Sequence, residues 1–106
     1  QINIGNEESK GGFEYDDGEK VFRAISALPA LKIEGLMAML PFTDDEGVLR
    51  PLAKKMRALY ERLRGESGDI KYLSMGMSGD WKLCVECGSN MVRLGTSIFG
   101  PRHYNV

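Results

Sequence analysis

Two short segments of the chain combine glycine with hydroxyl side chains, a composition typical of phosphate-binding loops. They are residues 77–80, Met-Ser-Gly-Asp, and residues 93–96, Arg-Leu-Gly-Thr. Each lies at or just after the end of an apolar run, and the first also precedes a predicted helix whose N-terminus would attract an anion. Two interpretations remain open from these residues alone: a phosphate cradle, or tight turns for which glycine and serine are simply suited.

The elements that position these segments are predicted to alternate along the chain. Apolar, β-prone runs predict four strands, which are buried on both faces because the runs do not alternate with polar residues. Helical spacing of apolar residues predicts three helices between them. The second is predicted to carry an apolar stripe of Leu52, Met56, Leu59, Tyr60 and Leu63. The predicted strands are residues 1–4, 33–39, 72–77 and 91–95, and the predicted helices are residues 17–28, about 48–64, and 79 or 80 to 87.

Local signals set the expected ends of these helices. Asp16 or Asp17 is expected to cap the first helix, and residues 43–46, Thr-Asp-Asp-Glu, fit a capping box. Pro51 is best tolerated in a first turn, which moves the expected start of the second helix to about Val48. Gly88 follows the third helix in a position suited to a left-handed residue that ends it.

The strand and helix order predicts an α/β fold with a parallel sheet and right-handed crossovers. A closed eight-stranded barrel needs about 250 residues, so a chain of 106 residues has room for only half of one. No linker or internal repeat divides the sequence, which is therefore expected to form a single domain over residues 1–106. In parallel α/β folds ligands bind beyond the carboxyl ends of the strands, where both glycine segments fall.

Composition excludes several classes of function. The chain has 14 Lys and Arg residues against 15 Asp and Glu residues, a formal net charge of −1, which argues against nucleic-acid and anionic-membrane partners. Its apolar runs are far shorter than the roughly 20 residues that span a bilayer. Two cysteines without secretory features favour reduced thiols and a cytoplasmic location.

Two longer segments, residues 73–80 (LSMGMSGD) and 91–100 (MVRLGTSIFG), occur together with residues 35–39 (GLMAM) and 1–13 (QINIGNEESKGGF). In this combination the sequence resembles the pyridoxal phosphate homeostasis protein family over essentially its whole length. It implies the C-terminal four strands of a TIM barrel of the alanine racemase-like, fold-type III kind, and pyridoxal 5′-phosphate (PLP) as cofactor. It also implies a role in vitamin B6 homeostasis, in a PLP carrier or regulator rather than an efficient enzyme.

The same resemblance implies a role for individual residues. Ser78, flanked by Met77 and Gly79, corresponds to the hydroxyl that binds the PLP phosphate, and the backbone N–H groups of Gly95 and Thr96 to further phosphate contacts. Arg93 corresponds to the arginine that faces the pyridine nitrogen. Because a guanidinium stays protonated and accepts no proton, that nitrogen would stay unprotonated and the cofactor would be a weak electron sink.

The lysine that carries PLP in the family is expected upstream of Gln1, so the N-terminal half of the barrel is expected to be absent from this chain. Lys10 is the one lysine expected at the carboxyl ends of the strands, where a solvated loop charge is the favoured interpretation. The missing half-barrel or a second copy of the chain is the expected protein partner. The alternative function is a fold-type III amino-acid racemase, which would need a catalytic base on each face of the cofactor.

Cys84 and Cys87 form a C-x-x-C spacing, but they lie at the C-terminal end of the predicted helix, where the dipole disfavours a thiolate. A zinc site would need two further ligands, and the chain has a single histidine, His103. These cysteines, and the methionines near the strands, are therefore expected to be apolar filling of the core.

Overall fold

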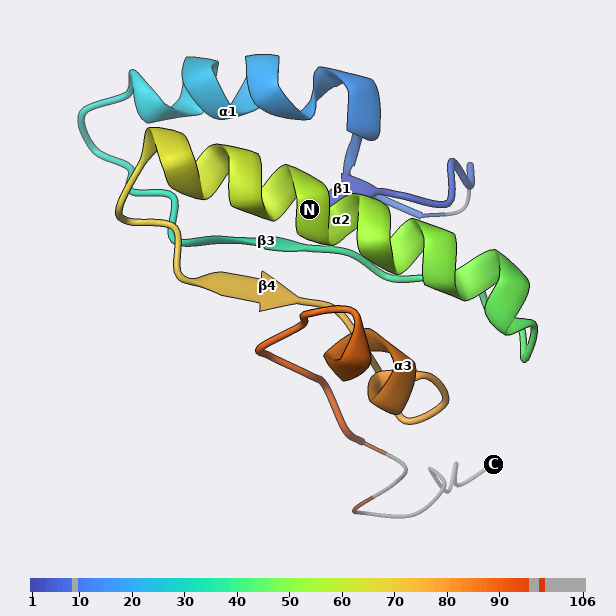
Figure 1. Ribbon diagram of the computed structural model, residues 1–106. Coiled ribbons are helices and arrows are strands. Elements are labelled where there is room, and N and C mark those ends of the chain that lie inside the picture. The colour runs from blue at the N-terminus through green and yellow to red at the C-terminus, as the bar shows by residue number, and fades with distance from the viewer. Residues whose placement is uncertain (9, 96–97, 99–106) are drawn as a thin grey trace, which may run out of the picture.

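The structure is a computed structural model that describes residues 1–8, 10–95 and 98. Strands and helices alternate along it, with one short strand and a 3-10 turn added before the first helix (Figure 1). The elements are β1 (Ile2–Asn3), β2 (Phe13–Glu14), η1 (Tyr15–Asp17), α1 (Gly18–Ser26), β3 (Gly35–Met37), α2 (Glu46–Glu66), β4 (Tyr72–Ser74) and α3 (Trp81–Glu86).

The strands pair in parallel, as predicted. β3 pairs with β4, β1 pairs with β2, and a single bridge from Ile2 to Ala38 joins the two pairs. A second bridge joins Ser74 to Met91, which marks the start of the predicted fourth strand. The strand regions therefore lie in the order β2, β1, β3, β4 and the Met91 segment, although each regular strand is shorter than predicted. The strand β2 was not predicted.

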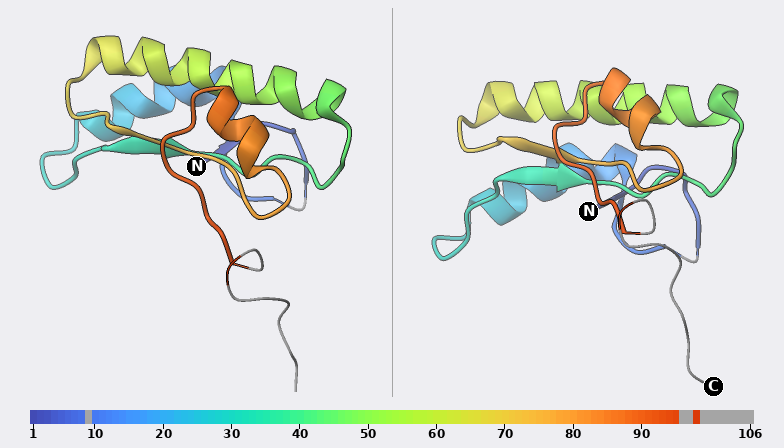
Figure 2. Two further views of the ribbon diagram at one scale, coloured as in Figure 1. Left: turned by 60° about the horizontal axis from the view of Figure 1, so that its bottom comes forward. Right: turned by 90° about the horizontal axis from the view of Figure 1, so that it is seen from below.

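Helices α1 and α2 lie side by side on one side of the strands (Figure 2). α1 is shorter than predicted, and no side-chain hydrogen bond caps it at Asp17. α2 begins at Glu46, two residues before the predicted start, because Asp45 caps it: the Asp45 carboxylate accepts a hydrogen bond of 2.8 Å from the Gly47 N–H. The expectation for Pro51 was wrong, since it lies inside α2 rather than in its first turn.

The short helix α3 packs against α2 and ends as predicted. Gly88 follows it with φ of 107°, a left-handed conformation that glycine adopts without steric cost. A Cβ at Gly88 would lie 2.6 Å from Cδ of Arg57, whose guanidinium donates a hydrogen bond of 2.8 Å to the Gly88 carbonyl. α2 therefore contributes directly to the end of α3.

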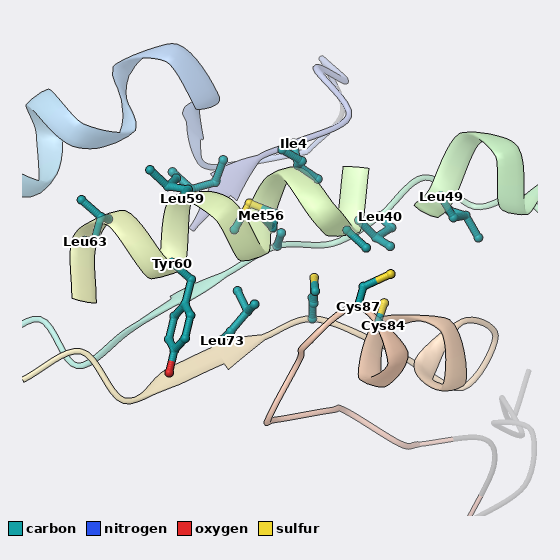
Figure 3. Close-up of a cluster of buried hydrophobic side chains, with 14 of the residues drawn as sticks. Ile4, Leu40, Leu49, Met56, Leu59, Tyr60, Leu63, Leu73, Cys84 and Cys87 are labelled. Carbon is teal, nitrogen blue, oxygen red and sulfur yellow. The ribbon is translucent and has the colours of Figure 1, made fainter. Parts of the chain in front are cut away.

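One continuous core lies between the helices and the strands (Figure 3). The predicted stripe of α2 is confirmed, since Met56, Leu59 and Leu63 are fully buried and Tyr60 nearly so. The strands contribute alternate residues to the same core: Ile2 and Ile4, Ala38 and Leu40, and Leu73 and Met75.

The prediction that the strands are buried on both faces was wrong for this chain. Successive strand residues point to opposite faces, and residues paired across two strands point to the same face. One face packs on the core, and we call the opposite one the helix-free face. It carries Asn3, Met37, Ser74, Met91 and Arg93. Met91 is 42% exposed there. Met77, just beyond β4, is equally exposed, so these two methionines are not core filling, whereas Met75 is.

Candidate functional site

Arg93 connects three neighbouring strand regions at their carboxyl ends. Its backbone N–H donates a hydrogen bond of 2.8 Å to the Gly76 carbonyl, just after β4. Its Nη2 donates a bond of 3.0 Å to the carbonyl of Ala38, just after β3. The guanidinium thus reaches past β4. Its Nε is buried and has no hydrogen-bond acceptor among the described residues. A buried, unused donor is costly unless a ligand or water supplies an acceptor.

Residues 77–80 form a tight turn between β4 and α3. The Met77 carbonyl accepts hydrogen bonds from the N–H groups of Asp80 (3.2 Å) and Trp81 (2.9 Å), and the Asp80 carboxylate accepts one from the Met77 N–H (2.7 Å). The turn is therefore held by its own backbone and by Asp80. Ser78, at its tip, is half-buried. A Cβ at Gly79 would meet no atom within 4 Å, so the backbone there is open to close approach.

Gly95, the corresponding glycine after the fourth strand region, is exposed and equally open, with no atom within 4 Å of a Cβ placed on it. Thr96 lies outside the described residues. The structure therefore brings Arg93 to the ends of β3 and β4, and presents Ser78, Gly79 and Gly95 in the loops that follow their strands.

A hollow of about 410 Å³ lies beside the 77–80 turn. Its walls come from the loop before α2, the start of α2, and the start of α3, and its side chains include acidic, basic and apolar types. The lining residues are Thr43, Asp44, Glu46, Leu49, and Ser78 to Leu83. Ser78 and Gly79 thus border a concave region of the surface.

The loop after β1 brings a second cation, Lys10, to the carboxyl ends of the strands. Lys10 donates a hydrogen bond of 2.8 Å from Nζ to the Leu40 carbonyl and forms a 2.7 Å ion pair with the Glu7 carboxylate. Its side chain is only 20% exposed. The expected position at the carboxyl ends of the strands is confirmed, but the expected solvated loop charge is not, because the ammonium is held by two protein acceptors.

The cysteines are buried and free, as expected. Burial raises the pKa of the Cys84 thiol to about 12, with a smaller contribution from the nearby Asp80 carboxylate, so this thiol is not a nucleophile at neutral pH. Among the described residues no group of three or more His, Cys, Asp or Glu side chains could hold a metal ion. Over the same residues, no helix is long and apolar enough to cross a membrane.

Sequence reasoning missed the contributions of Asn3 and Glu7. The carboxamide of Asn3 accepts a hydrogen bond of 3.0 Å from the Glu7 N–H and donates to the carbonyls of Glu7 (2.6 Å) and Lys10 (3.2 Å). One signal was present: Asn3 is a polar residue between two isoleucines in a strand, so it must point away from the core.

These features define a parallel α/β protein with polar and cationic groups at the carboxyl ends of its strands. The family described as "Alanine racemase, N-terminal domain" matches residues 1–103, and the chain belongs to that family. The pyridoxal phosphate homeostasis proteins of Aquifex aeolicus (38% identical over 105 residues) and Escherichia coli K12 (39% over 106 residues) are similar to 98% and 99% of the chain.

A solved structure supports the same relationship. The structure of PipY from Synechococcus elongatus PCC7942 with PLP bound superimposes with a TM-score of 0.74 at 30% identity, over 86% of this chain and 44% of PipY. The chain spans about half the length of the curated relatives that it matches, 46% of the Aquifex protein and 45% of the E. coli protein. The TIM-barrel-like fold expected from the sequence is therefore supported by its relatives.

Proposed function

We propose that this chain binds PLP at the carboxyl ends of its strands and acts in PLP homeostasis. The observation that carries the proposal is the arginine side chain on the helix-free face: Arg93 is fixed to the Ala38 carbonyl and keeps a buried Nε without an acceptor among the described residues. An unprotonated ring nitrogen is an acceptor of the kind that this donor lacks. The named relatives and the PLP complex of PipY make PLP the ring to test.

The phosphate is assigned to the loops after the strands. Ser78 offers a hydroxyl, and the open space at Gly79 and Gly95 lets a phosphate approach the backbone closely. Met77 precedes Ser78 and is exposed beside it. Thr96, expected to add a backbone N–H, is included in the proposed site from its position in the sequence.

The chemistry of this set favours holding PLP over using it in catalysis. Bound PLP supplies an electron-withdrawing ring, whose strength depends on protonation of its nitrogen. Arg93 donates a hydrogen bond to that nitrogen without transferring a proton, because a guanidinium does not deprotonate in proteins. The ring nitrogen then stays neutral, and carbanion chemistry on the ring is weakly supported.

The alternative, an amino-acid racemase, requires groups that exchange a proton with substrate on both faces of the ring. Among the residues that the structure describes, no specific contact favours it. The two cysteines are buried in and just after α3, and the raised pKa of Cys84 removes that thiol as a base. Incubation of the PLP-treated chain with L-alanine, followed by chiral chromatography, tests this alternative. Racemisation above that of free PLP would favour it.

We also propose the finer form of the fold, in which these strands form one side of a fold-type III barrel and the helix-free face points to its interior. Its partner there would be the remaining strands of such a barrel or a second copy of the chain. Light scattering on the purified chain tests the second partner, since a stable dimer would support it and a strict monomer would count against it.

PLP binding is tested by equilibrium dialysis of the chain in phosphate-free buffer, with Arg93→Gln as the test variant. Arg64→Gln is a matched control, because Arg64 is exposed on α2 and its loss changes the net charge equally. We expect Arg93→Gln to weaken PLP binding about tenfold or more, the order of one hydrogen bond to a charged donor. Equal binding by both variants would refute the assignment of Arg93.

The covalent state is tested on the same samples by borohydride reduction and peptide mass spectrometry. We expect no stoichiometric adduct, because Lys10, the lysine held at this edge, already binds Leu40 and Glu7. A single stoichiometric adduct at Lys10 would show that this chain carries its own covalent lysine.

A further inference from the structure

Asn3 points away from the core and binds the loop that carries Lys10. We call the carboxyl ends of the strands, where Lys10 binds Leu40 and Arg93 binds Ala38, the ligand edge. The neighbours of Asn3, Ile2 and Ile4, are each only 5% exposed and belong to the core, so Asn3 points to the helix-free face. A polar side chain on this face does not stabilise the packing between strands and helices. The role of its hydrogen bonds must therefore be sought in the loop that follows β1.

The hydrogen bonds that the Asn3 carboxamide makes with described residues go to the loop that follows β1. The carbonyl oxygen accepts from the Glu7 N–H at 3.0 Å, while the amide nitrogen donates to the Glu7 carbonyl at 2.6 Å and to the Lys10 carbonyl at 3.2 Å. One side chain thus binds both residues of the Glu7–Lys10 ion pair through their backbones. The position of that pair depends on Asn3.

The fixed loop places the Lys10 ammonium next to the end of β3. Nζ binds the Leu40 carbonyl at 2.8 Å and the Glu7 carboxylate at 2.7 Å. An ammonium has three N–H donors, and among the described residues the Leu40 carbonyl accepts one of them, while the Glu7 carboxylate lies at ion-pair distance. A remaining donor can serve a ligand.

The second cation of the edge is bound to the same stretch of chain. Arg93 binds the Ala38 carbonyl and Lys10 the Leu40 carbonyl, two residues apart. In extended backbone two such carbonyls lie about 7 Å apart. Both cations are therefore bound to the same short stretch of chain.

We propose that Asn3 is a positioning residue, which holds Lys10 as the second cation of the ligand edge beside Arg93. The proposal rests on the proposed function for its ligand, PLP, but its structural part is tested without any ligand. Asn3 acts only through the loop, so its removal should free Lys10 and weaken the binding that Lys10 supports.

The structural part is tested by competitive acetylation of the ligand-free chain with a trace of acetic anhydride, read by peptide mass spectrometry. Lys54, exposed on α2, is the internal reference. In the unmodified chain we expect Lys10 to react more slowly than Lys54. In Asn3→Ala we expect the Lys10 rate to rise about fivefold relative to Lys54, the effect of losing roughly one net hydrogen bond. An unchanged ratio would overturn the proposal.

Two further variants keep this test decisive. Asn3→Asp retains the acceptor for the Glu7 N–H but sets a carboxylate oxygen against the carbonyls of Glu7 and Lys10, so we expect the Lys10 rate to rise in this variant as well, and it serves if Asn3→Ala does not fold. Ile70→Val removes one buried methyl group before β4, far along the strand from the ligand edge. It destabilises the chain without touching the loop, so a comparable rise in Lys10 reactivity there would show that Asn3 acts only through general stability.

The functional part is tested by PLP affinity in a double-mutant cycle of Asn3→Ala and Lys10→Gln. We expect each single variant to bind PLP about tenfold more weakly, and the double variant to bind no more weakly than Lys10→Gln alone, because both remove the same cation. Additive losses would overturn the positioning role. Absence of PLP binding in the unmodified chain would refute the proposed function, while the acetylation result would still decide the role of Asn3.

Discussion

Replacing Ser89 with alanine should destabilise the chain, because it removes a hydroxyl that lies beside buried backbone carbonyls at the end of β4. Ser89 lies after α3 and is 8% exposed. Its Oγ lies 2.6 Å from the carbonyl of Met75, 3.1 Å from that of Leu73 and 3.0 Å from that of Met91. The Leu73 carbonyl lies in β4, the Met75 carbonyl just after it and the Met91 carbonyl in the fourth strand region, so the hydroxyl lies where these segments meet.

The magnitude follows from which carbonyl loses its partner. The Leu73 carbonyl also accepts a bond of 3.2 Å from the Asn90 N–H, and the Met91 carbonyl one of 3.1 Å from the Met75 N–H. The Met75 carbonyl lies nearest to the Ser89 hydroxyl, at 2.6 Å, and accepts no backbone hydrogen bond among the described residues. Leaving that one buried acceptor without its donor costs about 2 kcal/mol. For 106 residues this corresponds to a fall in Tm of about 9 °C.

The assay is urea and thermal unfolding of Ser89→Ala, followed by circular dichroism. Ser67→Ala is the matched control, because the Ser67 hydroxyl accepts a single exposed bond of 3.3 Å from the Asp69 N–H. We expect the control to change stability by less than about 0.5 kcal/mol. If Ser89→Ala is no less stable than Ser67→Ala, then a water molecule or a shifted backbone replaces the hydroxyl, and the reasoning fails.

Three other substitutions or conditions test the fold by the same unfolding measurements. Gly35→Ala should destabilise by about 2 kcal/mol or more, because a Cβ would lie 2.5 Å from the Tyr72 carbonyl oxygen and force β3 from β4; retained stability would contradict the register. Pro51→Ala should stabilise α2 by about 1 to 3 kcal/mol, because proline inside a helix lacks the N–H that bonds the carbonyl four residues earlier; a loss would show that the proline ring is packed. Cys84, with its pKa raised to about 12 from 9.0, binds its proton more tightly in the folded chain. Stability should therefore be unaffected by this thiol below about pH 9 and fall by at most about 1.4 kcal/mol per pH unit above it, and a Cys84→Ala variant should lose that part of the alkaline dependence.

The helices were the more predictable elements because their signals are local. The stripe of α2 is set by apolar residues at helical spacing, and all but Leu52 of the predicted stripe are buried. Gly88 ends α3 because a left-handed residue is needed there, which is also a local requirement. The start of α2 was less predictable: both Thr43 and Asp45 are good caps, and only the fold shows that Asp45 is used while the Thr43 hydroxyl accepts from the Asp45 N–H.

The burial of the strands could not be predicted from the same sequence. An apolar run indicates what a strand tolerates on each face and not what covers it. Met77 and Met91 are apolar by type but 42% exposed, because the helices of this chain lie on one side of the strands. The pairing of β2 with β1 is also a tertiary effect, since Phe13 and Glu14 carry no alternating pattern that would mark a strand.

The candidate site was found from the sequence only where its residues follow one another in the chain. Ser78 and Gly79 form one segment, as do Arg93 and Gly95, and glycine next to a hydroxyl or a cation is a visible signal. The Asn3 and Lys10 contacts join residues that are seven apart in the chain, and Lys10 reaches Leu40 across thirty positions. Such contacts depend on how two loops meet at the carboxyl ends of the strands, and the spacing of residues within one segment does not predict them.

Because successive strand residues point to opposite faces, the side chains that stabilise the core and those proposed to bind the ligand lie on different faces of the strands. Ile2 and Ile4 pack in the core, while Asn3 between them holds the loop that carries Lys10. Met75 is fully buried, while Arg93, on the opposite face of the next strand region, binds across to Ala38. Because the two sets occupy opposite faces, removing a ligand-edge side chain removes hydrogen bonds but no apolar contact of the core. Loss of PLP binding in Arg93→Gln should therefore occur in a chain that still unfolds cooperatively, which separates a binding defect from a folding defect.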